Sequence, residues 1–132
     1  MISVLLTTLA LSGGSPAVAP QAARSPDSPI RLSLNADAYY ERGDRAKVRL
    51  RLADDGYVVV LRADVDGRVR VLFPLDPADD DFVRGGRDLE LRGRGDRETF
   101  LVDDRAGSGT VLAAVSSDPF HYDRFVRGDH WD

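Results

Sequence analysis

Side chains that commonly carry out catalysis are scarce in this sequence. The chain has no cysteine and only two histidines, His121 and His130, both after the last expected strand. Gly107-Ser108-Gly109 lacks the spacing of a nucleophile elbow, in which a serine stands between a strand and a helix. No pair of carboxylates lies in the sequence context of a glycosidase. The sequence therefore predicts no catalytic residue and favours a protein that is not an enzyme.

Two acidic stretches have the composition of a cation site. Asp64-Val65-Asp66-Gly67 resembles the start of a calcium loop but lacks the later ligands and the closing glutamate of an EF-hand, so a hairpin turn explains it more simply. The loop over residues 76–81 holds four carboxylates: Asp76, Asp79, Asp80 and Asp81. Charged loops are usually solvated, so we predict no metal ligand and no cofactor, and leave calcium binding at this loop open. A minimal hydrolase that uses this loop and the two histidines is the alternative function.

Aromatic residues are the best candidates for a binding surface. Five residues are expected near one end of the fold, where strand ends and long loops gather: Phe73, Pro74, Phe82, Phe120 and Tyr122. Exposed aromatic clusters are typical of interaction sites. The competing interpretation is that these side chains close the core. We take them as the candidate partner-binding residues, with a protein or an envelope polymer as the partner.

Composition limits the class of protein further. The chain has 132 residues, of which 42% are hydrophobic, which suits one domain with its own core. Lys and Arg number 18 and Asp and Glu 22, for a net charge of −4, and the two signs alternate along the chain. This pattern lacks the basic surface that nucleic-acid binding requires. Asp greatly outnumbers Glu, as expected of a chain rich in turns and poor in helix.

The first 23 residues form a distinct segment, because every charged residue of the chain lies after them. An apolar run from Ile2 to Leu11 leads to Ala17-Val18-Ala19, a small-residue pattern typical of signal-peptide cleavage. The run is too short for a stable membrane span. We therefore expect residues 1–23 to be a signal peptide, residues 24–29 a linker, and the protein to be periplasmic or secreted. A disordered N-terminus is the alternative.

The expected fold centres on a hairpin from Tyr57 to Pro74. A β-branched run, Tyr57–Leu61, is followed by Asp66-Gly67 and then by apolar residues at every second position. We expect the first strand to be buried on both faces and the second to have one face toward water.

Alternation and turn residues predict further strands at 30–34, 46–52, 87–91, 99–102 and 110–116. About seven strands predict an all-β fold, a small antiparallel β-sandwich of immunoglobulin-like type over residues 30–120, with a small closed barrel as the alternative. Residues 121–132 form an aromatic-rich C-terminal segment. Either a short helix from Tyr122 to Val126 folds back over the sandwich, or the natural chain continues beyond Asp132.

Several phrases occur in order and at close spacing: Asp55-Gly56-Tyr57-Val58, Asp66-Gly67-Arg68-Val69 and Leu72-Phe73-Pro74. Together with weaker matches on both sides, over residues 30–120, they resemble the bacterial domain of unknown function 4384. Members of that family look like exported or envelope-associated domains, often joined to kinases, caspase-like peptidases or repeats. The resemblance implies a non-catalytic sensor or interaction role. A structural spacer in a longer protein is a further alternative.

Overall fold

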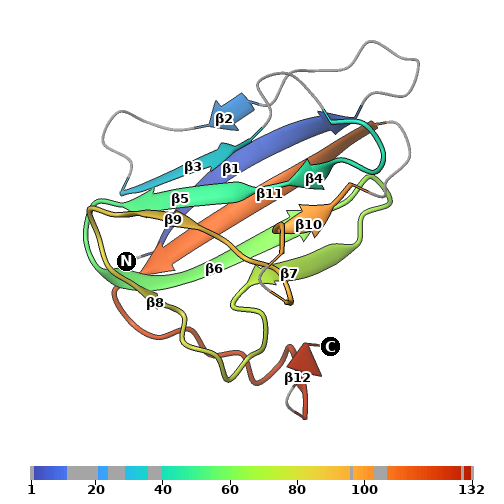
Figure 1. Ribbon diagram of the computed structural model, residues 1–132. Coiled ribbons are helices and arrows are strands. Elements are labelled where there is room, and N and C mark those ends of the chain that lie inside the picture. Colours follow the sequence, from blue (N-terminus) through green and yellow to red (C-terminus); the bar gives the residue numbers. More distant parts are fainter. Residues whose placement is uncertain are drawn as a thin grey trace.

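The structure is a computed structural model that describes residues 2–11, 21–23, 29–35, 40–95, 97–102, 107–128 and 130–131. Within these residues all regular structure is β, with thirteen strands and no helix (Figure 1). The strands are β1 (Ile2–Leu11), β2 (Gln21–Ala23), β3 (Ile30–Leu34), β4 (Arg45–Ala46), β5 (Val48–Leu52), β6 (Gly56–Ala63), β7 (Val69–Phe73), β8 (Phe82–Val83), β9 (Asp88–Glu90), β10 (Phe100–Leu101), β11 (Gly107–Ser116), β12 (Val126–Arg127) and β13 (His130–Trp131).

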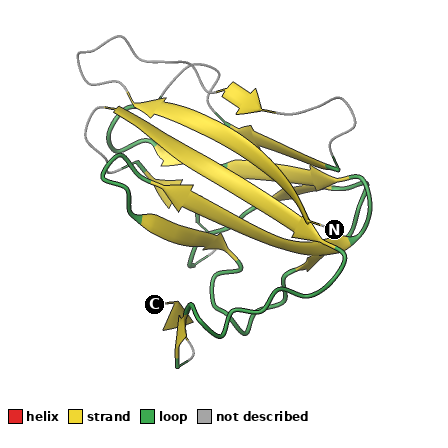
Figure 2. Cartoon of the chain, turned by 180° about the vertical axis from the view of Figure 1, so that it is seen from behind, coloured by secondary structure: helices red, strands yellow, loops and turns green. Residues whose placement is uncertain are grey.

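The strands form two layers, which confirms the predicted small antiparallel β-sandwich. The larger sheet has the order β2-β1-β11-β6-β7, and β8 also pairs with β6. The second layer consists of the sheet β3-β5-β9 and the short pair β10-β4. Figure 1 shows this second layer in front of the larger sheet, and Figure 2 shows the larger sheet from behind.

Alternating burial along the strands builds the core between the layers. β5 has every second residue buried, and β3 buries its first and third. β6 follows the same rule, because successive side chains of a strand point to opposite faces. The most deeply buried side chains include Ile30, Leu50, Leu52, Val58, Val60 and Val111. Their burial contributes the main favourable term of folding.

Arg62 is a charged side chain within this core. It is 2% exposed, and its guanidinium carbon lies 4.2 Å from the centre of the Phe100 ring. A cation over an aromatic face is stabilised by the charge distribution of the ring. The contact joins β6 to β10 and therefore links the two layers.

The predicted hairpin is formed by β6 and β7, and Asp64 closes its turn. The Asp64 Oδ1 atom accepts hydrogen bonds from the N–H groups of Asp66 (3.1 Å) and Arg68 (2.9 Å). Gly67 has a φ of 83°, which a hairpin turn of this kind favours in glycine. The carboxylate that suggested a calcium loop thus holds the backbone of the turn.

Burial within the hairpin differs from the expectation. β6 is fully buried on one face only, since Val59 and Leu61 on the other face are half-buried. In β7, Leu72 is the buried residue, whereas Val69 is 64% exposed. The register shifts between Val60 and Leu61, and this irregularity gives β7 an extra residue, Leu72, which turns toward the core. The alternating valines of β7 therefore lie on the outer face of the larger sheet.

Residues 2–11, which were expected to belong to a signal peptide, form β1 of the larger sheet. β1 pairs with β11 along its whole length, from Ile2 opposite Ser116 to Leu11 opposite Gly107. It lies between β2 and β11. Removal of residues 1–23 on export stays a prediction, and it would leave β11 at the edge of the sheet.

Residues 119–128 and 130–131, called the C-terminal segment from here on, contain a turn and a short hairpin. The Phe125 N–H donates a hydrogen bond to the Tyr122 carbonyl oxygen (2.7 Å), and β12 pairs with β13. The alternative of a helix from Tyr122 to Val126 is therefore wrong. The segment lies below β7 in Figure 1. No helix long and apolar enough to cross a membrane occurs among the described residues.

Candidate functional site

A hydrophobic pocket of about 510 Å³ lies between the outer face of the larger sheet and the C-terminal segment. We call it the aromatic pocket. Its floor consists of Val59 and Leu61 of β6 and of Val69 and Val71 of β7. Its wall consists of residues of the C-terminal segment: Phe120, His121, Tyr122, Phe125 and Trp131. A concave, mostly apolar surface of this volume is typical of ligand sites.

The pocket leaves large hydrophobic side chains in contact with water. Val69 is 64% exposed and Phe125 is 63% exposed. Val69 lies on the outer face of the larger sheet, opposite Ala63 of β6, and Phe125 lies in the C-terminal segment. Exposed apolar side chains that gather in one concave region mark interaction sites.

The aromatic rings of the wall pack on one another in defined geometries. Phe120 and Tyr122 are stacked, with centroids 6.2 Å apart and planes inclined by 24°. Tyr122 and Trp131 meet edge to face, with centroids 4.8 Å apart. Such pairs add about 0.5–1.5 kcal/mol beyond the area that they bury. Three of the five wall residues, Phe120, Tyr122 and Trp131, therefore support one another.

Hydrogen bonds attach the wall to the loop that follows β7. The Trp131 Nε1–H group lies 3.2 Å from the Pro74 carbonyl oxygen and 3.0 Å from that of Leu75, and it donates to both. The Tyr122 hydroxyl donates to Asp81 Oδ2 (2.7 Å). Burial, and then the hydrogen bond to Asp81, raise the pKa of Tyr122 far above its ordinary value. Tyr122 therefore stays protonated and keeps donating.

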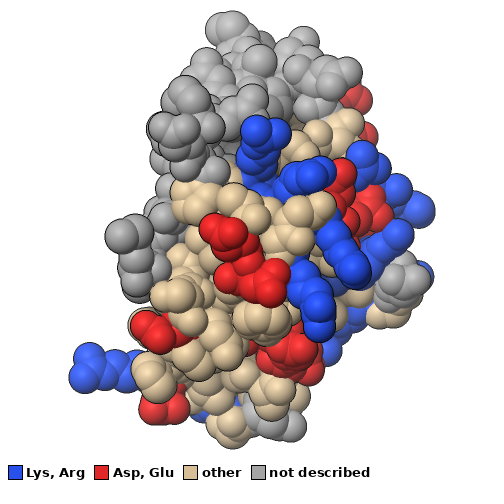
Figure 3. Space-filling view, turned by 90° about the vertical axis from the view of Figure 1, so that its left-hand side faces the viewer, with Lys and Arg blue, Asp and Glu red and all other residues tan. Residues whose placement is uncertain are grey.

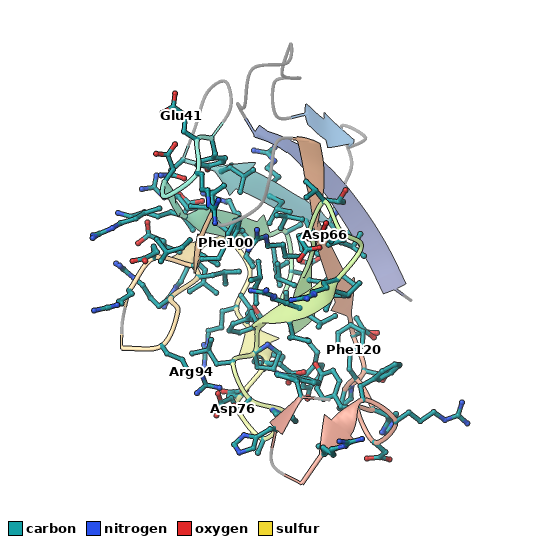
Figure 4. The ribbon with its side chains drawn as sticks, turned by 90° about the vertical axis from the view of Figure 1, so that its right-hand side faces the viewer. Glu41, Asp66, Asp76, Arg94, Phe100 and Phe120 are labelled. Carbon is teal, nitrogen blue, oxygen red and sulfur yellow. The ribbon has the colours of Figure 1, made fainter. Side chains whose placement is uncertain are left out.

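The four carboxylates of this loop make contacts within the protein. Asp76 accepts a hydrogen bond from Arg94 Nη2 (2.7 Å), and this bond holds the pKa of Asp76 below its ordinary value. Figure 4 shows the two side chains beside each other. Asp79 accepts from the Asp76 N–H (3.1 Å), and Asp80 accepts from the Phe82 N–H (3.0 Å). The loop is thus shaped by its own acidic side chains.

The structure separates the five predicted partner-binding residues. Phe120 and Tyr122 line the aromatic pocket. Pro74 is fully buried and Phe73 packs against the core. Neither residue lines the aromatic pocket. Phe82 lies outside the pocket, in β8, with its ring edge to face with Tyr57 at 5.2 Å.

Sequence reasoning missed the floor of the pocket and two of its aromatic residues. Phe125 and Trp131 belong to the segment that the sequence marked as rich in aromatic residues, and Trp131 is the only tryptophan. The sequence predicts that the second strand of the hairpin has one face toward water, and its alternation alone does not show that Val69 and Val71 lie on the outer face. In the structure, Val71 lies opposite Leu61 and Val69 opposite Ala63, so apolar residues of both strands share the outer face.

The alternative of a hydrolase requires Asp79, Asp81 and His121 in one pocket. His121 lines the aromatic pocket and a neighbouring pocket of about 590 Å³, but neither lining includes Asp79 or Asp81. His130 Nδ1 lies 4.0 Å from Asp76 Oδ1, beyond hydrogen-bonding distance. Within the residues that the structure describes, no group of three acidic or histidine side chains is placed to hold a metal ion.

These features define an all-β sandwich domain with an aromatic pocket on one outer face. The chain belongs to the family described as Domain of unknown function (DUF4384), whose model matches residues 39–119. The match confirms the resemblance found in the sequence. It contains the floor of the aromatic pocket, and the aromatic wall follows it directly. Comparisons with curated proteins and with solved structures find no match.

Proposed function

We propose that this protein is an exported, non-catalytic module that binds a partner protein through the aromatic pocket. The pocket itself carries the proposal, because it combines a rigid aromatic wall with exposed apolar side chains. Burying Val69 and Phe125 against a partner would remove apolar area from water, at about 25 cal/mol per Å². Central apolar anchors of this kind supply most of the binding energy in protein interfaces.

The surroundings of the pocket indicate the chemistry of the partner. Exposed Asp79 and Asp80 lie on the loop that Tyr122 and Trp131 contact, and exposed Asp123 lies on the C-terminal segment. A partner segment that inserts an aromatic or aliphatic side chain and carries Lys or Arg beside it matches both features. Charge complementarity of this kind increases specificity and the rate of association.

The proposal that the module is not an enzyme rests on its inventory of side chains. The pocket is lined by aliphatic and aromatic side chains and one exposed histidine, His121, and the polar atoms of Tyr122 and Trp131 already donate hydrogen bonds within the protein. General acid–base catalysis needs a side chain held within hydrogen-bonding distance of the proton that it transfers. Binding needs only the shape and the apolar surface.

The proposal of export rests on the uncharged first 23 residues and the Ala17-Val18-Ala19 pattern. A fusion of the full chain to a reporter that is active only outside the cytoplasm should give signal, and deletion of residues 1–23 should abolish it. Unchanged localisation after the deletion would contradict export.

Binding can be tested with peptides, because Trp131 is the only tryptophan and lies in the pocket wall. Titration with acetyl-Lys-Phe-Lys-amide should shift the tryptophan emission, and the acidic peptide acetyl-Glu-Phe-Glu-amide should bind more weakly. Val69→Lys should weaken binding by about tenfold, because it places a charge in the apolar floor. Leu101→Lys is the matched control, since Leu101 is 49% exposed and lies outside the pocket.

Three outcomes would overturn the partner proposed here. Equal losses for Val69→Lys and Leu101→Lys would show that only net charge matters. Binding of glycan fragments, but of neither peptide, would indicate an envelope polymer instead of a protein. The absence of saturable binding by any of these probes would favour the structural spacer.

A further inference from the structure

A second pocket, of about 420 Å³, lies among the strands of the other layer. We call it the basic pocket, because its lining consists of four cations and one anion: Arg45, Lys47, Arg92, Arg97 and Glu98. The whole chain has a net charge of −4, so this concentration of positive charge stands out. The aromatic pocket and its proposed partner do not involve these residues.

A buried hydroxyl group fixes the backbone around the basic pocket. Thr99 Oγ1 accepts a hydrogen bond from the Val48 N–H (2.9 Å) and donates one to the Leu91 carbonyl oxygen (2.7 Å). Thr99 is buried, so no water competes for these bonds. The residues next to these three in sequence line the pocket: Lys47, Arg92 and Glu98.

The turn between Arg92 and Arg97 is equally constrained. The Gly93 N–H donates a hydrogen bond to the Arg97 carbonyl oxygen (3.2 Å). A Cβ atom at Gly93 would lie 2.5 Å from the Glu98 carbonyl oxygen, so only glycine allows this close approach. The turn therefore brings the two arginines to one pocket.

A single amide side chain fixes the other side of the pocket. Asn35 Nδ2 donates a hydrogen bond to the Arg45 carbonyl oxygen (3.1 Å), and Asn35 Oδ1 accepts one from the Lys47 N–H (2.9 Å). The Tyr40 hydroxyl donates to the same Asn35 oxygen. The backbone that carries Arg45 and Lys47 is thus held in one conformation.

The positive charge of the basic pocket is only partly neutralised. Arg92 Nη2 lies 2.8 Å from Glu90 Oε2. Among the described residues, no carboxylate oxygen lies within 4.0 Å of a charged nitrogen of Arg45, Lys47 or Arg97. Within the described part of the chain, these three cations can therefore contact a ligand that brings its own negative charge.

We propose that the basic pocket binds a phosphate group. The planar guanidinium group donates two parallel hydrogen bonds to phosphate oxygens, and the pocket is lined by three guanidinium groups and one ammonium group. A group with two negative charges balances this lining better than a carboxylate does. The volume falls in the range of small-molecule sites and leaves space for an organic group that carries the phosphate.

The test is an isothermal titration calorimetry experiment on the full chain. Inorganic phosphate and glycerol 3-phosphate are titrated separately at constant ionic strength. Saturable binding is expected, and Arg45→Gln and Arg97→Gln should each weaken it by about tenfold, as charge-assisted hydrogen bonds are lost. Arg31→Gln is the matched control, because Arg31 is exposed on β3 and lies outside the pocket. Glu98→Gln should tighten binding by about threefold.

The results separate the possible sources of the phosphate. Tighter binding of glycerol 3-phosphate assigns a phosphate ester, and equal binding assigns the phosphate group alone. The proposal would be overturned if Arg31→Gln lost as much phosphate affinity as Arg45→Gln and Arg97→Gln. It would also be overturned if neither probe saturated the protein, or if acetate bound as tightly as phosphate. Thermal melting of each variant checks that the fold is intact.

Discussion

The outer faces of the two layers differ in chemistry although the same alternation of side chains builds both. On the larger sheet, Val59, Leu61 and Val69 face outward and form the floor of the aromatic pocket. On β5 of the other layer, the outward positions are occupied by Arg49 and Arg51. A strand that buries one face leaves the other free to take any composition.

The difference in composition explains why one outer face is partly covered by another segment and the other is exposed to solvent. Apolar residues on the larger sheet require cover, and the C-terminal segment supplies part of it through Tyr122 and Trp131. The charged face needs no cover. Its pairs, Arg49 with Glu90 and Arg51 with Asp88, each 3.6 Å apart, are partly solvated and weak. On the face shown in Figure 3, basic and acidic side chains likewise lie next to one another.

One ion pair connects the two regions. Arg94 belongs to the turn that carries Arg92 and Arg97 of the basic pocket. Its partner, Asp76, follows Leu75, whose carbonyl oxygen accepts a hydrogen bond from Trp131. The turn beside one pocket therefore contacts the loop that holds the wall of the other.

The largest expected effect is that of removing residues 1–23. The larger sheet would lose β1, so β11 would lie at its edge, while the second layer would keep its strand pairs. We expect the melting temperature to fall by about 10 °C, at about 4 °C per kcal/mol. Thr7→Pro in the full chain should cause a smaller fall, because proline removes a hydrogen bond of the ladder. Melting followed by circular dichroism measures both, and an unchanged melting temperature would show that β1 adds no stability.

Trp131→Ala should be the most damaging single substitution in the aromatic pocket. It removes two hydrogen bonds and the edge-to-face contact with Tyr122, at a cost of about 3 kcal/mol. Phe125→Ala is the control, because Phe125 is 63% exposed and should cost less than about 1 kcal/mol. Urea unfolding compares the two, and equal costs would mean that Trp131 does not anchor the segment.

Placing a charge on the apolar face should lower the stability of the fold more than placing an apolar residue on the charged face. Val59→Arg places a charge in the floor of the aromatic pocket and should cost about 2 kcal/mol. Arg49→Val on the other layer should change the stability by less than about 0.5 kcal/mol, since Glu90 keeps its contact with Arg92. Equal costs in urea unfolding would erase the distinction between the faces.

The smallest expected effect concerns the pH dependence of the pair between Asp76 and Arg94. The pKa of Asp76 is lowered in the folded state, so its contribution to stability is present above the ordinary value of 3.8 and is lost as the pH falls below it. Arg94→Gln should therefore lower the melting temperature slightly at pH 7, and this deficit should shrink as the pH falls below 3.8. Arg87→Gln, an exposed arginine in a neighbouring turn, is the control. A deficit that is the same below pH 3.8 as at pH 7 would contradict this origin.

The sequence predicted the strands because burial in a sandwich follows a period of two residues. The strand predicted at 30–34 is β3, the one predicted at 46–52 is divided into β4 and β5, and the one predicted at 110–116 lies within β11. The period does not say which face meets the core. The outward position of Val69 and Val71 therefore does not follow from the alternation, and the irregularity that turns Leu72 to the core has no marker in the sequence.

The basic pocket could not be found from the sequence at all. Arg45 and Arg97 are far apart in the chain and come together only through the pairing of β4 with β10 and the hydrogen bonds of Thr99. The aromatic pocket was partly predictable, since Phe120 and Tyr122 were identified by type. Its floor depends on the register of β6 and β7, which local patterns do not fix.

The most direct test follows the backbone amide signals of the ¹⁵N-labelled full chain during two separate titrations. Acetyl-Lys-Phe-Lys-amide should shift the signals of Val69, Val71 and Tyr122 and leave those of Arg45 and Arg97 unchanged. Inorganic phosphate at constant ionic strength should do the reverse. Shifts of the same residues with both probes, or of none of these residues, would contradict two chemically distinct binding faces.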